Sequence, residues 1–113
     1  MAHGDLIDSV RAAGGSYFTT HLLVDRAKAA GEGPWVDVRG FRSLSLDVEG
    51  LVDGALVLRG SNAKGTPVGA GHQVGEAITA DGLVALALSV CWLRCDVVTP
   101  NHAEVTAILH AVA

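Results

Sequence analysis

The chain has 113 residues, of which half are apolar and 18% are charged, and its net charge is −4. This length suits one domain that folds without a metal or a disulfide. The basic residues are scattered, which predicts no nucleic-acid partner, and the longest apolar stretch, residues 83–90, is far shorter than the roughly 20 residues that cross a membrane. The positive mean hydropathy indicates either apolar surface that is covered in an assembly or simply a composition rich in Ala and Val.

The first segment of the chain carries a helical pattern. Over residues 5–13, Leu6, Ile7 and Val10 fall on one face of a helix, and two glycines follow as a stop signal. A helix this short is marginal on its own in water. We therefore expect residues 1–15 to form an N-terminal arm or helix that is either anchored on a partner or frayed. The segment has no basic start followed by an apolar run, so we expect no secretory signal.

The rest of the chain, residues 16–113, carries the pattern of a single β domain. Leu44, Leu46 and Val48 alternate with polar side chains, which is the period of a strand with one buried face. The glycines of residues 50–54 and the apolar run that follows predict a hairpin. The sequence predicts an all-β fold, a single antiparallel β-sandwich or jelly-roll-like barrel of about eight short strands. The predicted strands are residues 16–24, 35–38, 41–49, 55–59, 76–79, 83–88, 91–98 and 104–112.

Two connections in this pattern are of particular interest. The break at Arg39 and Gly40 fits either a turn or a bulge within one bent strand. Residues 60–72 form a long glycine-rich loop, and loops of this length in compact domains are commonly functional or mobile.

Reactive residue types are present, but their spacing predicts no reactive site. Cys91 and Cys95, on one strand, would lie about 13 Å apart, beyond the roughly 7 Å limit for a disulfide. Two thiols also fall short of a zinc ligand set, so we predict buried, reduced cysteines. The five histidines show no metal-ligand spacing, and the serines include no nucleophile elbow. We expect no catalytic residue, cofactor or metal, and hence no enzyme.

Several stretches between residues 20 and 110 resemble a known group of proteins. They include a Gly-Phe-Arg-Ser sequence at residues 40–43, a Gly-Ser-Asn strand end at 60–62 and a Trp-Leu-Arg sequence at 92–94. The chain resembles small β-sandwich proteins encoded among the structural genes of tailed bacteriophages, which decorate or cement capsids or serve as accessory pieces of tails. The resemblance implies a non-enzymatic virion component that binds other virion subunits in several copies.

From this resemblance we expect a capsid decoration or cement protein, made in the host cytoplasm, that binds the major capsid protein on the outer head surface as a homo-oligomer, with a trimer as our guess. The alternatives are a tail accessory protein or a carbohydrate-binding module in host adhesion. For the latter, Trp92 and Arg94 share a strand face and form either a small platform or part of a second buried layer. The candidate partner-binding residues are Leu6, Ile7, Val10, Tyr17, Phe18, His72, Trp92 and Arg94.

Overall fold

A computed structural model describes residues 5–11, 17–87 and 89–113, with side chains described from residue 18 onward, apart from residue 88. Within these residues the chain is entirely β, and no helix has the length and hydropathy needed to cross a bilayer. The strands are β1 (Asp5–Arg11), β2 (Tyr17–Ala27), β3 (Val36–Asp37), β4 (Ser43–Glu49), β5 (Ala55–Ser61), β6 (His72–Ile78), β7 (Gly82–Leu86), β8 (Trp92–Thr99) and β9 (Val105–Val112).

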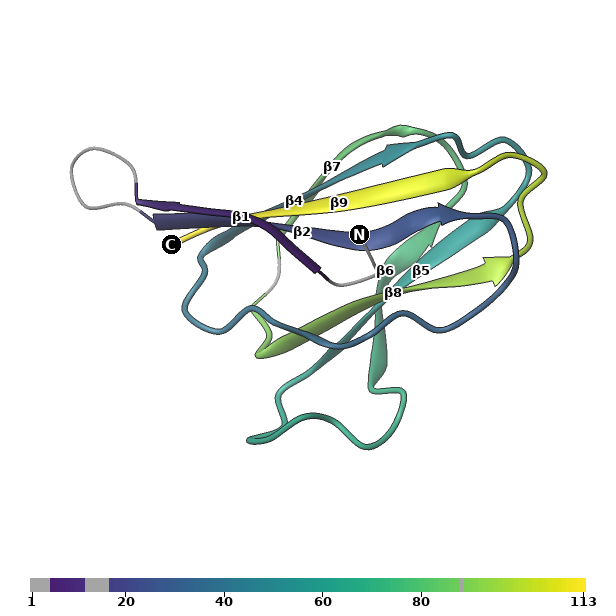
Figure 1. The fold of residues 1–113 in the computed structure, drawn as a ribbon. Coiled ribbons are helices and arrows are strands. Elements are labelled where there is room, and N and C mark those ends of the chain that lie inside the picture. Colours follow the sequence, from purple (N-terminus) through teal and green to yellow (C-terminus); the bar gives the residue numbers. More distant parts are fainter. Residues whose placement is uncertain (1–4, 12–16, 88) are drawn as a thin grey trace.

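The strands form two antiparallel sheets that face each other (Figure 1). The five-stranded sheet has the order β1-β2-β9-β4-β7, and the four-stranded sheet has the order β3-β8-β5-β6. The predicted all-β sandwich is therefore confirmed, with one strand more than the expected eight among the described residues.

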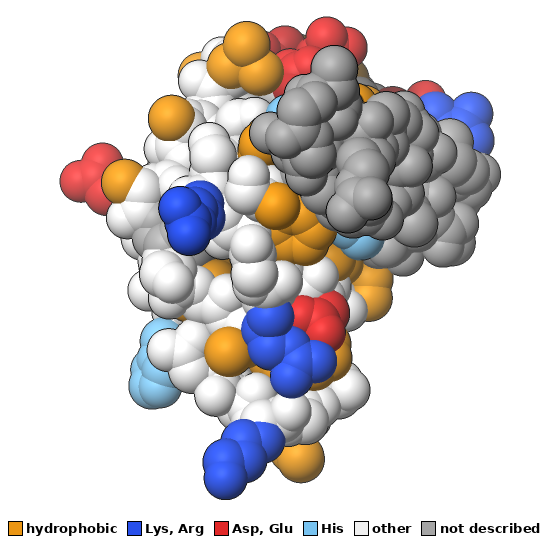
Figure 2. Space-filling model, turned by 90° about the vertical axis from the view of Figure 1, so that its left-hand side faces the viewer, with side chains coloured by type: hydrophobic (Ala, Val, Ile, Leu, Met, Phe, Trp, Pro, Cys, Tyr) orange, Lys and Arg blue, Asp and Glu red, His pale blue; other side chains and the backbone are white. Residues whose placement is uncertain are grey.

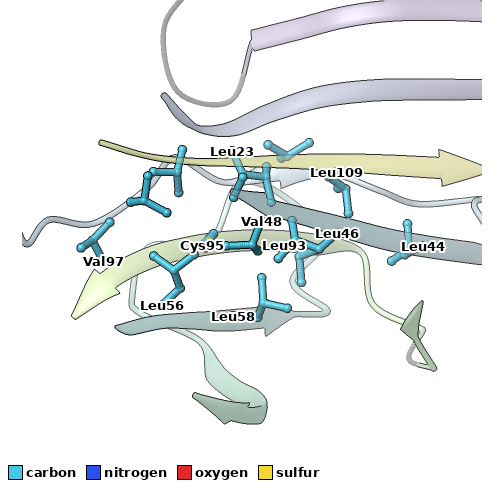
Figure 3. Packing of buried hydrophobic residues seen from close by; sticks show 14 of the residues in the cluster. Leu23, Leu44, Leu46, Val48, Leu56, Leu58, Leu93, Cys95, Val97 and Leu109 are labelled. Atoms are coloured by element: carbon cyan, nitrogen blue, oxygen red, sulfur yellow. The ribbon is translucent and has the colours of Figure 1, made fainter. Parts of the chain in front are cut away.

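The core between the sheets is built by the two-residue alternation of the strands. Leu44, Leu46 and Val48 of β4 point inward and are buried, whereas the polar residues between them face outward. Leu93 and Cys95 of β8 meet them from the opposite sheet (Figure 3). Because aromatic residues are few, aliphatic side chains fill this space almost alone.

The predicted hairpin across residues 50–54 is wrong. β4 pairs with β7 and β9 in one sheet, whereas β5 pairs with β6 and β8 in the other. The glycine-containing segment therefore carries the chain from one sheet to the other. A hairpin within one sheet and a crossing between two sheets both need turn residues. The glycines of residues 50–54 therefore could not distinguish these two connections.

The break at residues 39–40 is a turn. The amide of Phe41 donates to the carbonyl of Val38, and Gly40 has φ 84°, as the third position of a type II turn requires. The turn separates β3 from β4, which lie in different sheets.

The helix expected within residues 5–13 is wrong over the described residues 5–11. These residues form β1, which pairs antiparallel with β2 from Asp5 opposite Leu22 to Arg11 opposite Tyr17, with an irregularity between Leu6 and Asp8. Pairing with a long neighbouring strand supplies backbone hydrogen bonds that a short isolated helix lacks. The predicted boundary between an arm and a domain, at residues 15 and 16, lies outside the described residues.

Candidate interaction surface

The outer face of the four-stranded sheet carries a connected group of charged and aromatic side chains. On β8 the core side chains alternate with Trp92, Arg94 and Asp96, which face away from the core. Arg59 of β5 lies directly opposite Arg94 in the register of the sheet. The alternation of these two central strands thus places four polar or amphipathic groups on one surface.

Asp96 is the centre of this group. Its Oδ2 accepts hydrogen bonds from Nη2 of Arg94 at 3.0 Å and from Nε of Arg59 at 3.2 Å. Its Oδ1 accepts from the amide of Gly33 at 3.0 Å. Arg94 is only 5% exposed, and the carboxylate of Asp96 compensates its charge. Glu32 adds a longer contact with Arg94 at 3.7 Å. Such a carboxylate partner offsets the free-energy cost of removing the guanidinium from water.

The segment before β3 covers Arg94 and forms a second layer over the sheet. The ring of Trp35 lies 5.1 Å from the guanidinium carbon of Arg94, which is cation–π geometry. Gly33 allows this close approach, because a Cβ there would lie 2.2 Å from the carbonyl oxygen of Cys95. Gly31 exchanges two backbone hydrogen bonds with Val97. Of the two alternatives for Arg94, the structure therefore favours a second buried layer over an open platform.

A second arginine–tryptophan pair lies at the other end of β8. The guanidinium of Arg39 lies 5.4 Å from the ring of Trp92 and binds the carboxylate of Asp37, with Nη2 to Oδ2 at 2.6 Å. The side-chain hydrogen bonds from Arg39 lower the pKa of Asp37 below its ordinary value. The indole Nε1 of Trp92 donates to the carbonyl of Ala63 at 3.1 Å. Both tryptophans therefore have an arginine on one ring face.

A hollow of about 410 Å³ lies beside the Asp96 cluster, between the segment before β3 and the loop after β5. Arg59 and Val98 line it from the sheet, and Ala70 lines it from the loop. Arg94 also lines it, and its buried Nε has no hydrogen-bond partner among the described residues. The hollow is open, and charged and apolar residues line it alike, so it suits contact with a protein surface better than enclosure of a small molecule.

The residues predicted to bind partners do not form one site. Phe18 lies on the five-stranded sheet, where its ring contacts that of His110 at a centroid distance of 5.1 Å. His72 is exposed at the start of β6. Trp92 and Arg94 share a face of β8, whereas Phe18 stands opposite Val10 in the pairing of β2 with β1. The remaining predicted residues, Leu6, Ile7, Val10 and Tyr17, lie in β1 and at the start of β2, and their side chains are outside the described part.

The sequence pattern did not predict Arg59, Asp96 or Arg39 as members of this surface. One signal was available, because Arg94 and Asp96 stand two residues apart on a strand whose other face is apolar. Charged residues that alternate with core residues on a central strand indicate an outer face with its own network. The residue spacing gave no signal that the segment before β3 and strand β5 contribute contacts to Arg94 and Asp96.

The thiols and the titratable groups form no reactive centre in the part that the structure describes. Both cysteines are free, with Cys95 buried and Cys91 half-buried. Burial, with a smaller contribution from the charge of Asp96, raises the pKa of the Cys95 thiol to about 12. No group of three or more His, Cys, Asp or Glu residues in the described ranges is placed to hold a metal ion.

Comparison with known proteins gives one informative match. No protein-family model matches the chain, and no curated protein matches it. The crystal structure of the SPBc2 prophage-derived protein YomS is similar, with a TM-score of 0.69 and 14% sequence identity, over 87% of this chain and 95% of that chain. At this identity the match establishes a shared fold, and that fold extends over almost the whole length of both chains.

Proposed function

We propose that this chain is a structural protein of a tailed-phage virion and that it acts by binding other virion subunits. The observation that carries the proposal is the likeness to a prophage-derived protein over 87% of this chain and 95% of the other. The resemblance of segments between residues 20 and 110 to virion β-sandwich proteins supports the same assignment from the sequence.

Within this class we propose a decoration or cement protein on the outer surface of the head, present as a homotrimer. A compact sandwich supports this role, because a rigid fold loses little conformational entropy when it docks. The outer face of the four-stranded sheet is such a rigid surface, with a buried arginine held by Asp96 and Trp35. A position on the tail is the alternative that the test must separate.

A carbohydrate-binding role receives less support from the geometry. Sugar-binding platforms use the open faces of aromatic rings. Here a guanidinium occupies one face of Trp35 and one face of Trp92, and the indole N–H of Trp92 is bound to Ala63.

Immunogold electron microscopy tests the proposal on virions of the phage whose genome encodes the chain. We expect an antibody raised against the purified protein to label the heads of intact particles. Label on the tail alone would reject the decoration role and leave a tail accessory protein. Absence from purified virions, checked by immunoblotting, would overturn the whole proposal. Light scattering on the purified protein separates a trimer from a monomer of 11.6 kDa.

A further inference from the structure

The loop between β5 and β6, residues 62–71, projects from the four-stranded sheet. In Figure 1 it extends away from both sheets at the lower end of the molecule. Within this loop Val68 is fully exposed, the most exposed large hydrophobic residue in the described part of the chain. An isolated exposed valine on a surface has no special meaning, so the inference depends on how the loop is held.

The first limb of the loop is fixed at its root by hydrogen bonds. Oγ of Ser61 accepts from the amide of Ala63 at 3.2 Å, and Oδ1 of Asn62 accepts from the amide of Cys91 at 3.0 Å. The indole N–H of Trp92 holds the carbonyl of Ala63. The Gly-Ser-Asn end of β5 thus has a structural role, which is to fix the direction in which the loop leaves the sheet.

The returning limb is fixed by close packing. Gly71 has φ 60°, and a Cβ at this position would lie 2.5 Å from the carbonyl oxygen of Gly60 and 2.8 Å from the ring of Trp35. Only glycine fits such a position without strain. Trp92 therefore fixes the first limb of the loop, and Trp35 packs against the returning limb. The middle of the loop projects between two fixed ends.

The charge of the loop differs from that of the whole chain. Residues 62–71 contain one Lys and no acidic residue, whereas the chain carries a net charge of −4. Arg59 stands in the adjoining hollow, and its terminal nitrogens have no partner among the described residues. Figure 2 shows Lys and Arg side chains with hydrophobic ones at this lower end of the molecule, and one acidic group lies beside the upper basic cluster. A surface complementary to this loop would be apolar at its centre and acidic around it.

We propose that loop 62–71 is the docking element of this protein, and the inference rests on the proposed function. Val68 inserts into an apolar socket on a neighbouring virion subunit, and carboxylates around that socket pair with Lys64 and Arg59. Because both limbs are already fixed, little loop entropy is lost on docking, so a small contact can still contribute usefully to binding.

The test compares Val68→Asp with Val52→Asp in binding to particles from a phage strain that lacks the gene. Val52 is 64% exposed in the connection that precedes β5, at the opposite end of that strand, so it provides a matched control. Co-sedimentation with heads or tails, whichever structure carries the immunogold label, measures the affinity. We expect Val68→Asp to weaken binding at least tenfold, Lys64→Glu to weaken it severalfold, and Val52→Asp to bind like the wild type.

The outcomes separate the two proposals. If the wild-type protein does not bind particles, the proposed function fails. If the wild type binds and Val68→Asp binds equally well, only the docking element is overturned. Equal losses in Val68→Asp and Val52→Asp would overturn it too, because added charge alone would then explain the effect. The milder Val68→Ser variant and circular dichroism melts of every variant exclude misfolding as the cause.

Discussion

Cys95 shows how one strand of this protein joins two different environments. Its thiol lies in the core, 1% exposed, between two residues whose side chains point to the opposite face of the sheet. The apolar surroundings disfavour the thiolate and raise its pKa to about 12, and the carboxylate of Asp96 adds to this effect. A thiol in such a place packs as a small apolar group.

This pKa predicts a protected thiol. In a Cys91→Ser variant, Cys95 is the single cysteine, and at pH 8 its thiolate fraction is about a thousandfold below that of a free thiol with a pKa near 9. We expect iodoacetamide to modify the native protein very slowly and to modify it quickly in guanidinium chloride. Mass spectrometry follows the reaction. Rapid modification under native conditions would show that β8 opens or that the thiol is not in the core.

The sequence predicted the two faces of β8 but not the fate of Arg94. The alternation correctly assigned Leu93 and Cys95 to one face and Arg94 and Asp96 to the other. The burial of Arg94 depends on Trp35, which arrives from a segment nearly sixty residues earlier in the chain. Such a contact leaves no period in the sequence, so the alternation left open whether Arg94 belongs to an open platform or to a second buried layer.

Among the elements, the connection between β4 and β5 determines how the two sheets are joined. Asn101, which is buried, accepts hydrogen bonds at Oδ1 from the amides of residues 52–54, and its Nδ2 donates to the carbonyls of Gly50 and Ala103. The carboxylate of Asp81 accepts from the amides of Gly50 and Leu51. The crossing is therefore held by side chains from two other turns. Neither contact could be inferred from residues 50–54, and this explains the incorrect prediction of a hairpin.

Replacing Asn101 with Ala is expected to destabilise this crossing strongly. The change leaves three amides and two carbonyls without their present partner in a partly buried turn, which we expect to cost about 3 kcal/mol of the free energy of unfolding. Urea denaturation followed by fluorescence measures this cost. The exposed neighbour Glu104→Ala serves as control, with an expected change within about 0.5 kcal/mol. Equal costs for the two variants would remove Asn101 from this role.

The N-terminal segment shows that a local pattern of apolar residues does not by itself decide between helix and strand. Leu6, Ile7 and Val10 have helical spacing, yet residues 5–11 pair with β2 as an edge strand. Three apolar residues in a short window fit either period once one strand irregularity is allowed, and β1 has one between Leu6 and Asp8. The long neighbouring strand decides between them, and its length became evident only in the structure.

At the scale of the whole molecule, the apolar composition is explained mainly by the core. Both sheets contribute inward rows, and β9 alone buries Val105, Ala107, Leu109 and Ala111. The large hydrophobic residues that stay exposed in the described part are few and separate: Val52, Val68, Leu83 and Val98. Of the two explanations for the positive mean hydropathy, a composition rich in small aliphatic residues accounts for most of it from residue 18 onward, where the described side chains leave little exposed apolar area.

The same packing predicts that the two sheets unfold as one unit. Leu46 of β4 and Leu93 of β8 are fully buried and face each other's sheet (Figure 3), so Leu46→Ala or Leu93→Ala should each lower the free energy of unfolding by about 3 kcal/mol. Calorimetry should show a single transition, lowered by roughly 10 °C or more in each variant. Leu83→Ala, at a 78% exposed position in β7, should change little. Two separate transitions would mean that the sheets form independent units, because a shared core couples the stability of both.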